Sequence, residues 1–285
     1  MGLRRWYPED KFQTLEARMS AMRKRLGLAL GAGGAKGLCH LAFLKVLDEL
    51  GVRPNVIAGT SIGAIIGGFY AAGLSGAELE QELKKIGLKD LSKMALDFSM
   101  FSSSAILKGK MVEEFLKRAL PVRTFEELQI SLKVVATDFW KREEVVFDSG
   151  DLISAIRASS AMPFVFEPVV LQDAVLIDGG AVNPLPYDLI QSECDLTIAI
   201  DVSGVKDQPN GLVPNMLESV LSTFQIMQAS IVATKMKAGP PILYVKPELR
   251  NIRALDFYRY KEILSGVEEE VDQFRERIKK YLIFP

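Results

Sequence analysis

Histidine is almost absent from the sequence, since His40 is the only one among 285 residues. A single histidine excludes the histidine-rich ligand sets of common zinc hydrolases and leaves little room for a serine–histidine–acid triad. His40 follows a glycine-rich segment on an apolar helix pattern, where a histidine more often packs or braces a loop than acts as a base. Any hydrolytic base is therefore His40 or a carboxylate.

Cysteine and net charge are equally sparse. Two cysteines, Cys39 in an apolar helix pattern and Cys194 beside a strand pattern, offer no disulfide framework, and we expect buried, reduced thiols in a cytoplasmic protein. A net charge of −1 argues against a nucleic-acid partner. Seven basic and three acidic side chains lie in the first 25 residues, without the apolar core of a secretory signal. We expect residues 1–24 to form a basic helical extension that packs on the domain or rests on anionic lipid.

Long hydrophobic runs are missing as well. The uncharged stretch over residues 56–77 has the length of a membrane-spanning helix, but glycine, serine and threonine dilute it. A strand, a tight turn and a buried helix explain the same residues better. The turn is a Gly-x-Ser-x-Gly pentapeptide, Gly59 to Gly63, which predicts a nucleophile elbow with Ser61 at its tip. Taken alone, such a pentapeptide indicates a nucleophile elbow no more strongly than an ordinary packing turn between a strand and a helix.

A second glycine-rich turn follows the strand predicted at residues 26–30. A turn of this kind directs backbone N–H groups toward a phosphate or a developing oxyanion. Lys36 stands where a dinucleotide-binding fingerprint needs glycine, and Gly109-Lys110 is followed by Met111 instead of the Ser or Thr of a P-loop. Both nucleotide-binding patterns therefore fail. The turn consists of Gly31, Ala32, Gly33, Gly34, Ala35, Lys36 and Gly37.

Three carboxylates end apolar strand patterns: Asp138, Asp178 and Asp201. Only Asp178 precedes paired glycines, Gly179 and Gly180, a turn that allows close approach to another loop. An isolated Asp-Gly turn most often closes a hairpin. Beside Ser61 and the glycine-rich turn, Asp178 becomes the preferred candidate for the base.

The glycine-rich turn, the Gly-x-Ser-x-Gly pentapeptide and the Asp178-Gly179-Gly180 segment occur in the order typical of the bacterial patatin-like phospholipase family. The chain resembles this family over roughly residues 25–205. Further similarity lies in residues 155–163 and 182–186. The resemblance implies a three-layer α/β/α fold with a central, mostly parallel sheet and helical additions at both ends. It also implies a catalytic dyad of Ser61 and Asp178, an acyl-enzyme, no cofactor or metal, and an oxyanion hole at Gly33, Gly34 and Ala35. The supporting motif residues are Gly31, Ala32, Lys36, Gly37, Gly59, Gly63, Gly179 and Gly180.

One position departs from the family pattern. The family's first loop glycine is Ala32 here, and alanine suits that position if its φ is negative.

The substrate that the resemblance implies is a lipid or phospholipid ester. The alternative function is a non-catalytic α/β protein that binds an anionic or lipid ligand. Head group, acyl length and oligomeric state are not fixed by the sequence, and a peripheral position at the inner membrane surface stays open.

Alternating strand and helix patterns independently predict an α/β fold. We expect a hydrolase domain over residues 25–285, with a motif core at 25–205 and a helical part at 211–285. Residues 88–107 either form a lid or complete the core. Strands are predicted at 26–30, 132–139, 144–147, 169–171, 175–177, 196–202 and 242–245, and helices at 152–160, 216–236 and 258–281.

Overall fold

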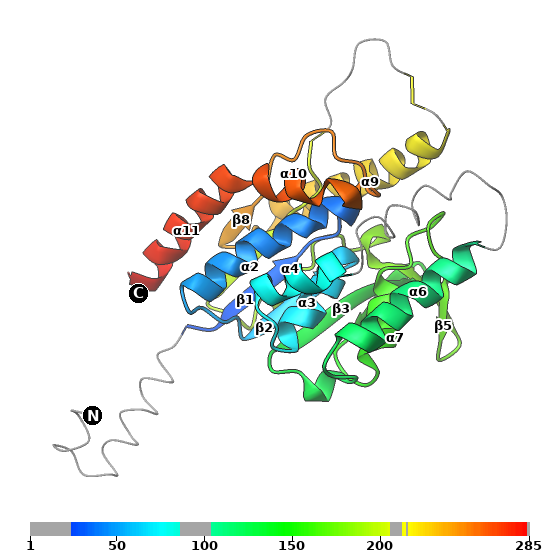
Figure 1. Cartoon of the computed structure of the whole chain (residues 1–285), viewed down its shortest axis with the longest axis horizontal. Coiled ribbons are helices and arrows are strands. Elements are labelled where there is room, and N and C mark those ends of the chain that lie inside the picture. Colours follow the sequence, from blue (N-terminus) through cyan, green and yellow to red (C-terminus); the bar gives the residue numbers. More distant parts are fainter. Residues whose placement is uncertain (1–23, 86–103, 206–212, 215, 284–285) are drawn as a thin grey trace.

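The structure is a computed structural model that describes residues 24–85, 104–205, 213–214 and 216–283 (Figure 1). Residues 1–23 of the predicted extension and residues 88–103 of the segment predicted either to form a lid or to complete the core lie outside this description. An eight-stranded sheet forms the centre, with pairing order β5-β6-β3-β2-β1-β7-β8 and β4 also paired to β3. The strands are β1 (Leu26–Leu30), β2 (Val56–Thr60), β3 (Ser131–Asp138), β4 (Glu143–Phe147), β5 (Val169–Leu171), β6 (Ala174–Asp178), β7 (Leu196–Ile200) and β8 (Leu243–Val245).

The sheet is mostly parallel. Strands β3, β2, β1, β7 and β8 run parallel to one another, whereas β4 and β6 pair antiparallel with β3, and β5 pairs antiparallel with β6. Strands β1, β2 and β7 are buried along their whole length, as expected for parallel strands that are covered on both faces. The predicted sheet type is thereby confirmed.

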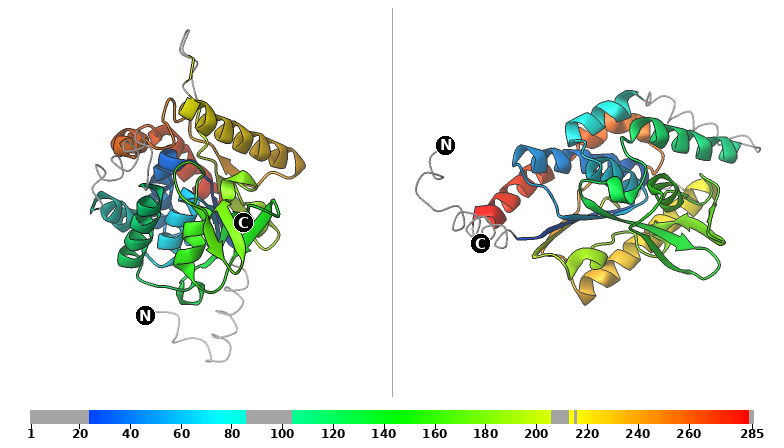
Figure 2. Two further views of the ribbon diagram at one scale, coloured as in Figure 1. Left: turned by 90° about the vertical axis from the view of Figure 1, so that its right-hand side faces the viewer. Right: turned by 90° about the horizontal axis from the view of Figure 1, so that it is seen from below.

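Helices cover both faces and complete three layers (Figures 1 and 2). Alternation along β1 divides the core, because Leu28 and Leu30 join the larger apolar cluster while Ala29 packs with α8 and α9. On the larger side lie α2 (His40–Glu49), α3 (Ile62–Ala71), α4 (Gly76–Lys85), α6 (Ser104–Ala119), α7 (Leu152–Ser159), α10 (Tyr260–Ser265) and α11 (Glu268–Ile283). On the other lie α8 (Asp188–Gln191) and α9 (Met216–Ala238), and the 3₁₀ turns are η1 (Gly34–Cys39), η3 (Phe125–Glu127), η4 (Gly179–Ala181) and η5 (Phe257–Arg259).

Two local predictions need correction. The single helix predicted at 258–281 is wrong, because Gly266 separates α10 from α11 and glycine is a poor helix former. Residues 104–107, the end of the segment predicted either to form a lid or to complete the core, are the first residues of α6. Cys39 is buried as expected, but Cys194 is only partly buried.

The ends of β2 and β6 meet on one edge of β3. Strand β2 pairs with residues 131–135 of β3, and β6 pairs with residues 136–138 of β3. Strand β4 pairs with residues 134–138 of β3, so its pairing region overlaps both of the others. One edge cannot pair with two strands at the same position, so β4 takes one edge while β2 and β6 share the other. On that shared edge Thr60 lies opposite Val135, and Asp178 lies opposite the next residue, Ala136. Two strands of opposite direction thus bring their carboxyl ends together.

Candidate active site

Ser61 occupies a tight turn between β2 and α3. Its φ of 57° and ψ of −123° lie outside the regions that ordinary residues favour, as in the strained elbows that expose a nucleophile. The turn needs Gly63, because a Cβ there would lie 2.1 Å from the carbonyl oxygen of Leu30. The chain can therefore double back against the end of β1 only with glycine at this position.

The hydroxyl of Ser61 donates a hydrogen bond to Oδ2 of Asp178 at 2.6 Å. This length is typical of an O–H···O⁻ bond to an ionised acceptor. The other carboxylate oxygen, Oδ1, accepts the N–H of Gly180 at 2.7 Å, which fixes the rotation of the side chain. The structure thus brings together the serine and the aspartate for which the family resemblance implies a dyad.

Asp178 is buried, with 1% of its surface exposed. Burial raises the pKa of its carboxyl group to about 6, against the lowering effect of the hydrogen bonds from Ser61 and Gly180. A carboxylate with a raised pKa is a stronger base than a solvated one, yet it is still ionised at neutral pH. The site therefore offers a carboxylate able to accept the Ser61 proton.

The other two strand-end carboxylates have structural partners. Asp138 accepts the N–H groups of Trp140 and Lys141 through Oδ1, both at 3.0 Å. Asp201 accepts the N–H of Ser203 at 2.9 Å and the hydroxyl of Tyr244 at 2.5 Å. Asp138 and Asp201 therefore stabilise their own turns. The paired glycines that follow Asp178 were the sequence feature that distinguished it from these two carboxylates.

The glycine-rich turn leaves the sheet beside the elbow. Leu30, the last residue of β1, lies opposite Gly59 of the parallel neighbour β2, so both turns begin at the same edge of the sheet. The N–H groups of Gly33 and Gly34 have no acceptor among the residues that the structure describes, whereas Ala35 donates its N–H to the carbonyl of Ala254 at 2.7 Å. Ala32 is not among the residues of positive φ, so alanine fits that position without strain.

His40 braces this turn from behind. Its Nε2 lies 3.0 Å from the carbonyl oxygen of Gly31, and the ring is completely buried. Burial lowers the pKa of His40 to about 4, opposed by the Gly31 hydrogen bond and by Asp201, so the ring is neutral at pH 7 and Nε2–H donates. The prediction of a loop-bracing role for His40 is confirmed.

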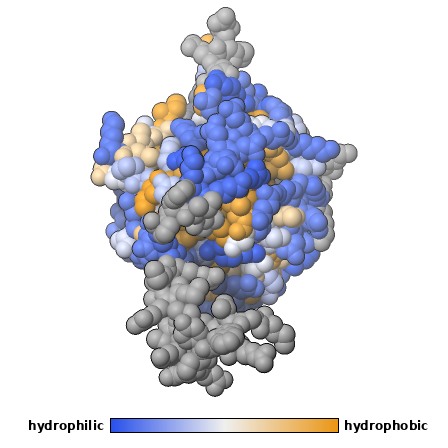
Figure 3. All heavy atoms as spheres, turned by 90° about the vertical axis from the view of Figure 1, so that its left-hand side faces the viewer, coloured by the Kyte–Doolittle hydropathy of each residue, from blue (hydrophilic) through white to orange (hydrophobic). Residues whose placement is uncertain are grey.

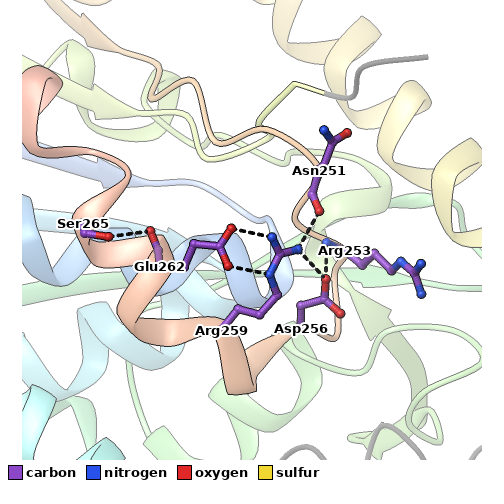
Figure 4. Close-up of polar contacts among 6 residues, drawn as sticks. All are labelled: Asn251, Arg253, Asp256, Arg259, Glu262 and Ser265. Atoms are coloured by element: carbon purple, nitrogen blue, oxygen red, sulfur yellow. Dashed lines mark hydrogen bonds and ion pairs between the residues drawn. The ribbon is translucent and has the colours of Figure 1, made fainter. Parts of the chain in front are cut away.

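A second support lies in the loop that carries Ala254 (Figure 4). The guanidinium of Arg259 donates to the carbonyl of Asn251 at 2.7 Å and to both carboxylate oxygens of Glu262. Asp256 accepts the N–H of Arg253 at 3.0 Å and contacts Arg259 at 3.3 Å. These bonds fix residues 251–262 and thereby hold the Ala254 carbonyl against the turn.

Two contacts at the elbow were not predicted from the sequence. The buried hydroxyl of Ser159, at the end of α7, accepts the N–H of Ser61 at 2.9 Å. Thr60 donates its hydroxyl to the carbonyl of Asn183 at 2.8 Å. Both residues lie in or beside segments that carry the family resemblance, which gave no role for either side chain.

Fold and site together define a three-layer α/β/α protein with a serine on a nucleophile elbow and an aspartate as its hydrogen-bond partner. VipD from Legionella pneumophila shares the fold, with a TM-score of 0.50 at 14% identity over 89% of this chain and 67% of that one. The family model described as patatin-like phospholipase matches residues 28–190. The chain belongs to the patatin-like phospholipase family.

Curated relatives extend the comparison. A protein named lysophospholipase NTE1 from Kluyveromyces lactis is 28% identical over 264 residues, which is 84% of this chain and 18% of that protein. An uncharacterised NTE-family protein of Mycobacterium bovis is 36% identical over 186 residues, which is 65% of this chain and 51% of the relative. The chain thus spans about half or less of the length of these relatives.

Proposed function

We propose that the protein is a serine acyl hydrolase that cleaves carboxylic ester bonds of lipids through Ser61 and Asp178. The observation that carries this proposal is the 2.6 Å hydrogen bond from the elbow serine to a buried carboxylate of raised pKa. Membership of the patatin-like phospholipase family supports the reaction class. The relative named a lysophospholipase makes lysophospholipids the first substrates to test, with phospholipids next.

In the first half of the reaction, Ser61 Oγ attacks the ester carbonyl carbon while Asp178 accepts the hydroxyl proton. The carbonyl oxygen becomes an oxyanion that the N–H groups of Gly33 and Gly34 stabilise. Ala35 is a further donor only if its N–H leaves the Ala254 carbonyl. A single donor of this kind contributes about 10²–10³ in rate in other hydrolases. Collapse of the intermediate expels the alcohol, which takes the proton from Asp178.

In the second half, Asp178 accepts a proton from water as the water oxygen attacks the acyl-enzyme. Collapse of the second intermediate breaks the bond to Ser61 Oγ, and the proton returns from Asp178 to Ser61 as the fatty acid leaves. Esters suit this pair, because a leaving alcohol needs less protonation than a leaving amine.

A fluorophosphonate probe tests the proposal directly. Wild type should be labelled and Ser61→Ala should not, while Ser230→Ala, which changes an exposed serine of α9, should be labelled like wild type. A folded but unlabelled wild type would favour the alternative of a non-catalytic lipid-binding protein. The proposed function also includes peripheral contact of the protein with the membrane that holds its lipid substrate.

The predicted contact through the N-terminal extension falls outside the described residues. Among the helices that the structure describes, none has the length and apolar character to cross a bilayer.

A further inference from the structure

Exposed apolar side chains gather close to the Ser61–Asp178 pair. Trp140 and Phe139, at the turn between β3 and β4, are 73% and 47% exposed, and their rings meet edge to face with centroids 4.9 Å apart. Val170 on β5 is 68% exposed, and Phe164, in the loop after α7, is 62% exposed. We name these four residues the apolar rim. Exposing so much aromatic surface to water has a cost, so a ligand or interface is expected there.

Backbone contacts tie the rim to the site. Phe139 donates its N–H to the carbonyl of Val175 at 2.8 Å, and β6 leads from Val175 to Asp178 within three residues. Three residues of strand span about 10 Å. On the other side, Phe164 follows by three residues Ala161, whose carbonyl accepts the N–H of Asp178 at 3.0 Å. The rim therefore lies beside the position where an ester would react.

The turn that carries Trp140 also carries two exposed cations. Arg142 forms no ion pair with any residue the structure describes, and Lys141 approaches Asp138 and Glu143 only at 3.8 and 3.9 Å. The neighbouring carboxylates Glu143 and Glu144 are also exposed, and Glu144 is held in place by a hydrogen bond from the amide of Asn183. Aromatic rings next to lysine and arginine are typical of protein surfaces that sit among phospholipid head groups.

Further exposed apolar residues lie at the start of α9. Figures 1 and 2 place the start of α9 on the same side as the β5–β6 hairpin, to the right in Figure 1, and Val213 and Met216 there are each 85% exposed. On the face seen from the opposite side, hydrophilic residues predominate and hydrophobic patches lie between them (Figure 3). Exposed apolar groups thus flank the end of the molecule at which the carboxyl ends of the parallel strands lie.

We propose that the apolar rim, with Lys141 and Arg142, docks the protein on an anionic phospholipid bilayer. This inference rests on the proposed function, because the bilayer would hold the lipid ester that Ser61 attacks. The rim comes from separate turns and a short hairpin, and separate tips suit insertion into a soft head-group layer. A stable protein interface needs about 800 Å² on each side, whereas the apolar rim consists of four side chains on three separate segments.

Tryptophan fluorescence tests the docking directly. The sequence has two tryptophans, so Trp6→Phe leaves Trp140 as the only tryptophan, whose emission is excited selectively over that of tyrosine. The probe is a vesicle of brominated ether-linked phospholipids, which lack the carboxylic ester that the enzyme would cleave, with or without anionic phospholipid. On anionic vesicles the Trp140 emission should shift to the blue and lose more than about half of its intensity to bromine, since the ring would enter the acyl region.

Variants supply a second measurement. Vesicle binding should fall about tenfold or more in Trp140→Ala and severalfold in Arg142→Gln, since buried aromatic area and lipid charge both contribute. Tyr281→Ala is the matched control, because Tyr281 is also an exposed aromatic residue but lies near the end of α11, at the other end of the molecule. Its binding should equal that of wild type.

A water-soluble short-chain ester separates this inference from the proposed function. Trp140→Ala should hydrolyse the soluble ester like wild type while it loses activity on vesicles. If Trp140 is not quenched and Trp140→Ala binds vesicles like wild type, the rim is not a membrane surface, even when the soluble ester is cleaved. If the soluble ester is not cleaved, the catalytic proposal fails, while bromine quenching still decides the docking.

Discussion

The hydroxyl oxygen of Ser159 accepts a hydrogen bond from the backbone N–H of Ser61 at 2.9 Å, although the two residues are 98 positions apart in the chain. Ser61 is the residue that precedes α3, and the N–H groups at the start of a helix have no acceptor within it. We predict that Ser159→Ala lowers the free energy of unfolding by about 1–3 kcal/mol, the cost of an unsatisfied buried donor.

Ester hydrolysis should fall about tenfold in the same variant, since the elbow loses the contact that holds its geometry, and tenfold corresponds to about 1.4 kcal/mol in the barrier. Denaturant unfolding and steady-state kinetics measure the two effects. Ser230→Ala, at an exposed serine of α9, should change neither. A Ser159→Ala protein with wild-type stability would show that this hydrogen bond contributes nothing.

Asp178→Asn should remove hydrolysis but stabilise the fold at neutral pH. In the folded protein the carboxyl is protonated up to pH about 6, whereas the unfolded one loses its proton near its ordinary pKa of 3.8. The free energy of unfolding of wild type therefore decreases as the pH rises from about 4 to 6, by up to about 3 kcal/mol. Asparagine removes this cost, so the variant should be the more stable protein at pH 8, and the difference should vanish near pH 4.

The same pKa sets the pH dependence of the reaction. Because the base must be ionised, kcat/KM of wild type should fall tenfold per pH unit below about pH 6, through a single ionisation. Asp178→Asn should lower kcat by about 10²–10⁴, the usual contribution of a general base. Retained hydrolysis in this variant would assign the base to another group.

His40→Gln should keep both the brace and the activity, because its amide also donates an N–H toward Gly31. His40→Leu removes the donor, and the unpaired Gly31 carbonyl should cost about 1–3 kcal/mol. Wild-type His40 stays neutral down to pH about 4 in the folded protein but takes up a proton near 6.5 when unfolded. Its contribution to stability is thus complete above pH 6.5 and is lost as the pH falls toward 4, a loss that His40→Gln should abolish.

Gly34→Ala should lower activity far more than the backbone strain of an alanine at positive φ explains, because the added Cβ also collides with a neighbouring carbonyl. Gly34 has a φ of 57°, and a Cβ there would lie 2.3 Å from the carbonyl oxygen of Ala254. Gly51 is the matched control, since its φ is 65° but nothing lies within 4 Å of its added Cβ. Gly51→Ala should cost about 1 kcal/mol with full activity. Gly34→Ala should lose about 10²–10³ in kcat through displaced N–H donors, and equal effects of the two changes would contradict this account.

Much of the sheet could be predicted because its strands are short and continuously apolar. Residues 26–30 and 169–171 were predicted with the bounds that the structure has, and the flanking glycines marked the turns. The pairing of Ser61 with Asp178 was an expectation from family resemblance, since it depends on strand register, which no local pattern encodes. The bond from Ser61 to Ser159 was missed for the same reason: a serine after an apolar helix pattern gives no signal of its partner.

The shared edge of β3 has a consequence for how this protein gains activity as it folds. Ser61 and Asp178 are 117 residues apart in the chain, and they meet only after β2 and β6 have both paired with β3. Contacts between residues so distant in sequence form late, because closing long loops costs entropy before any contact compensates. A refolding intermediate with β1, β2 and β3 in place would have an elbow but no base, so reactivity toward a fluorophosphonate reports completion of the sheet.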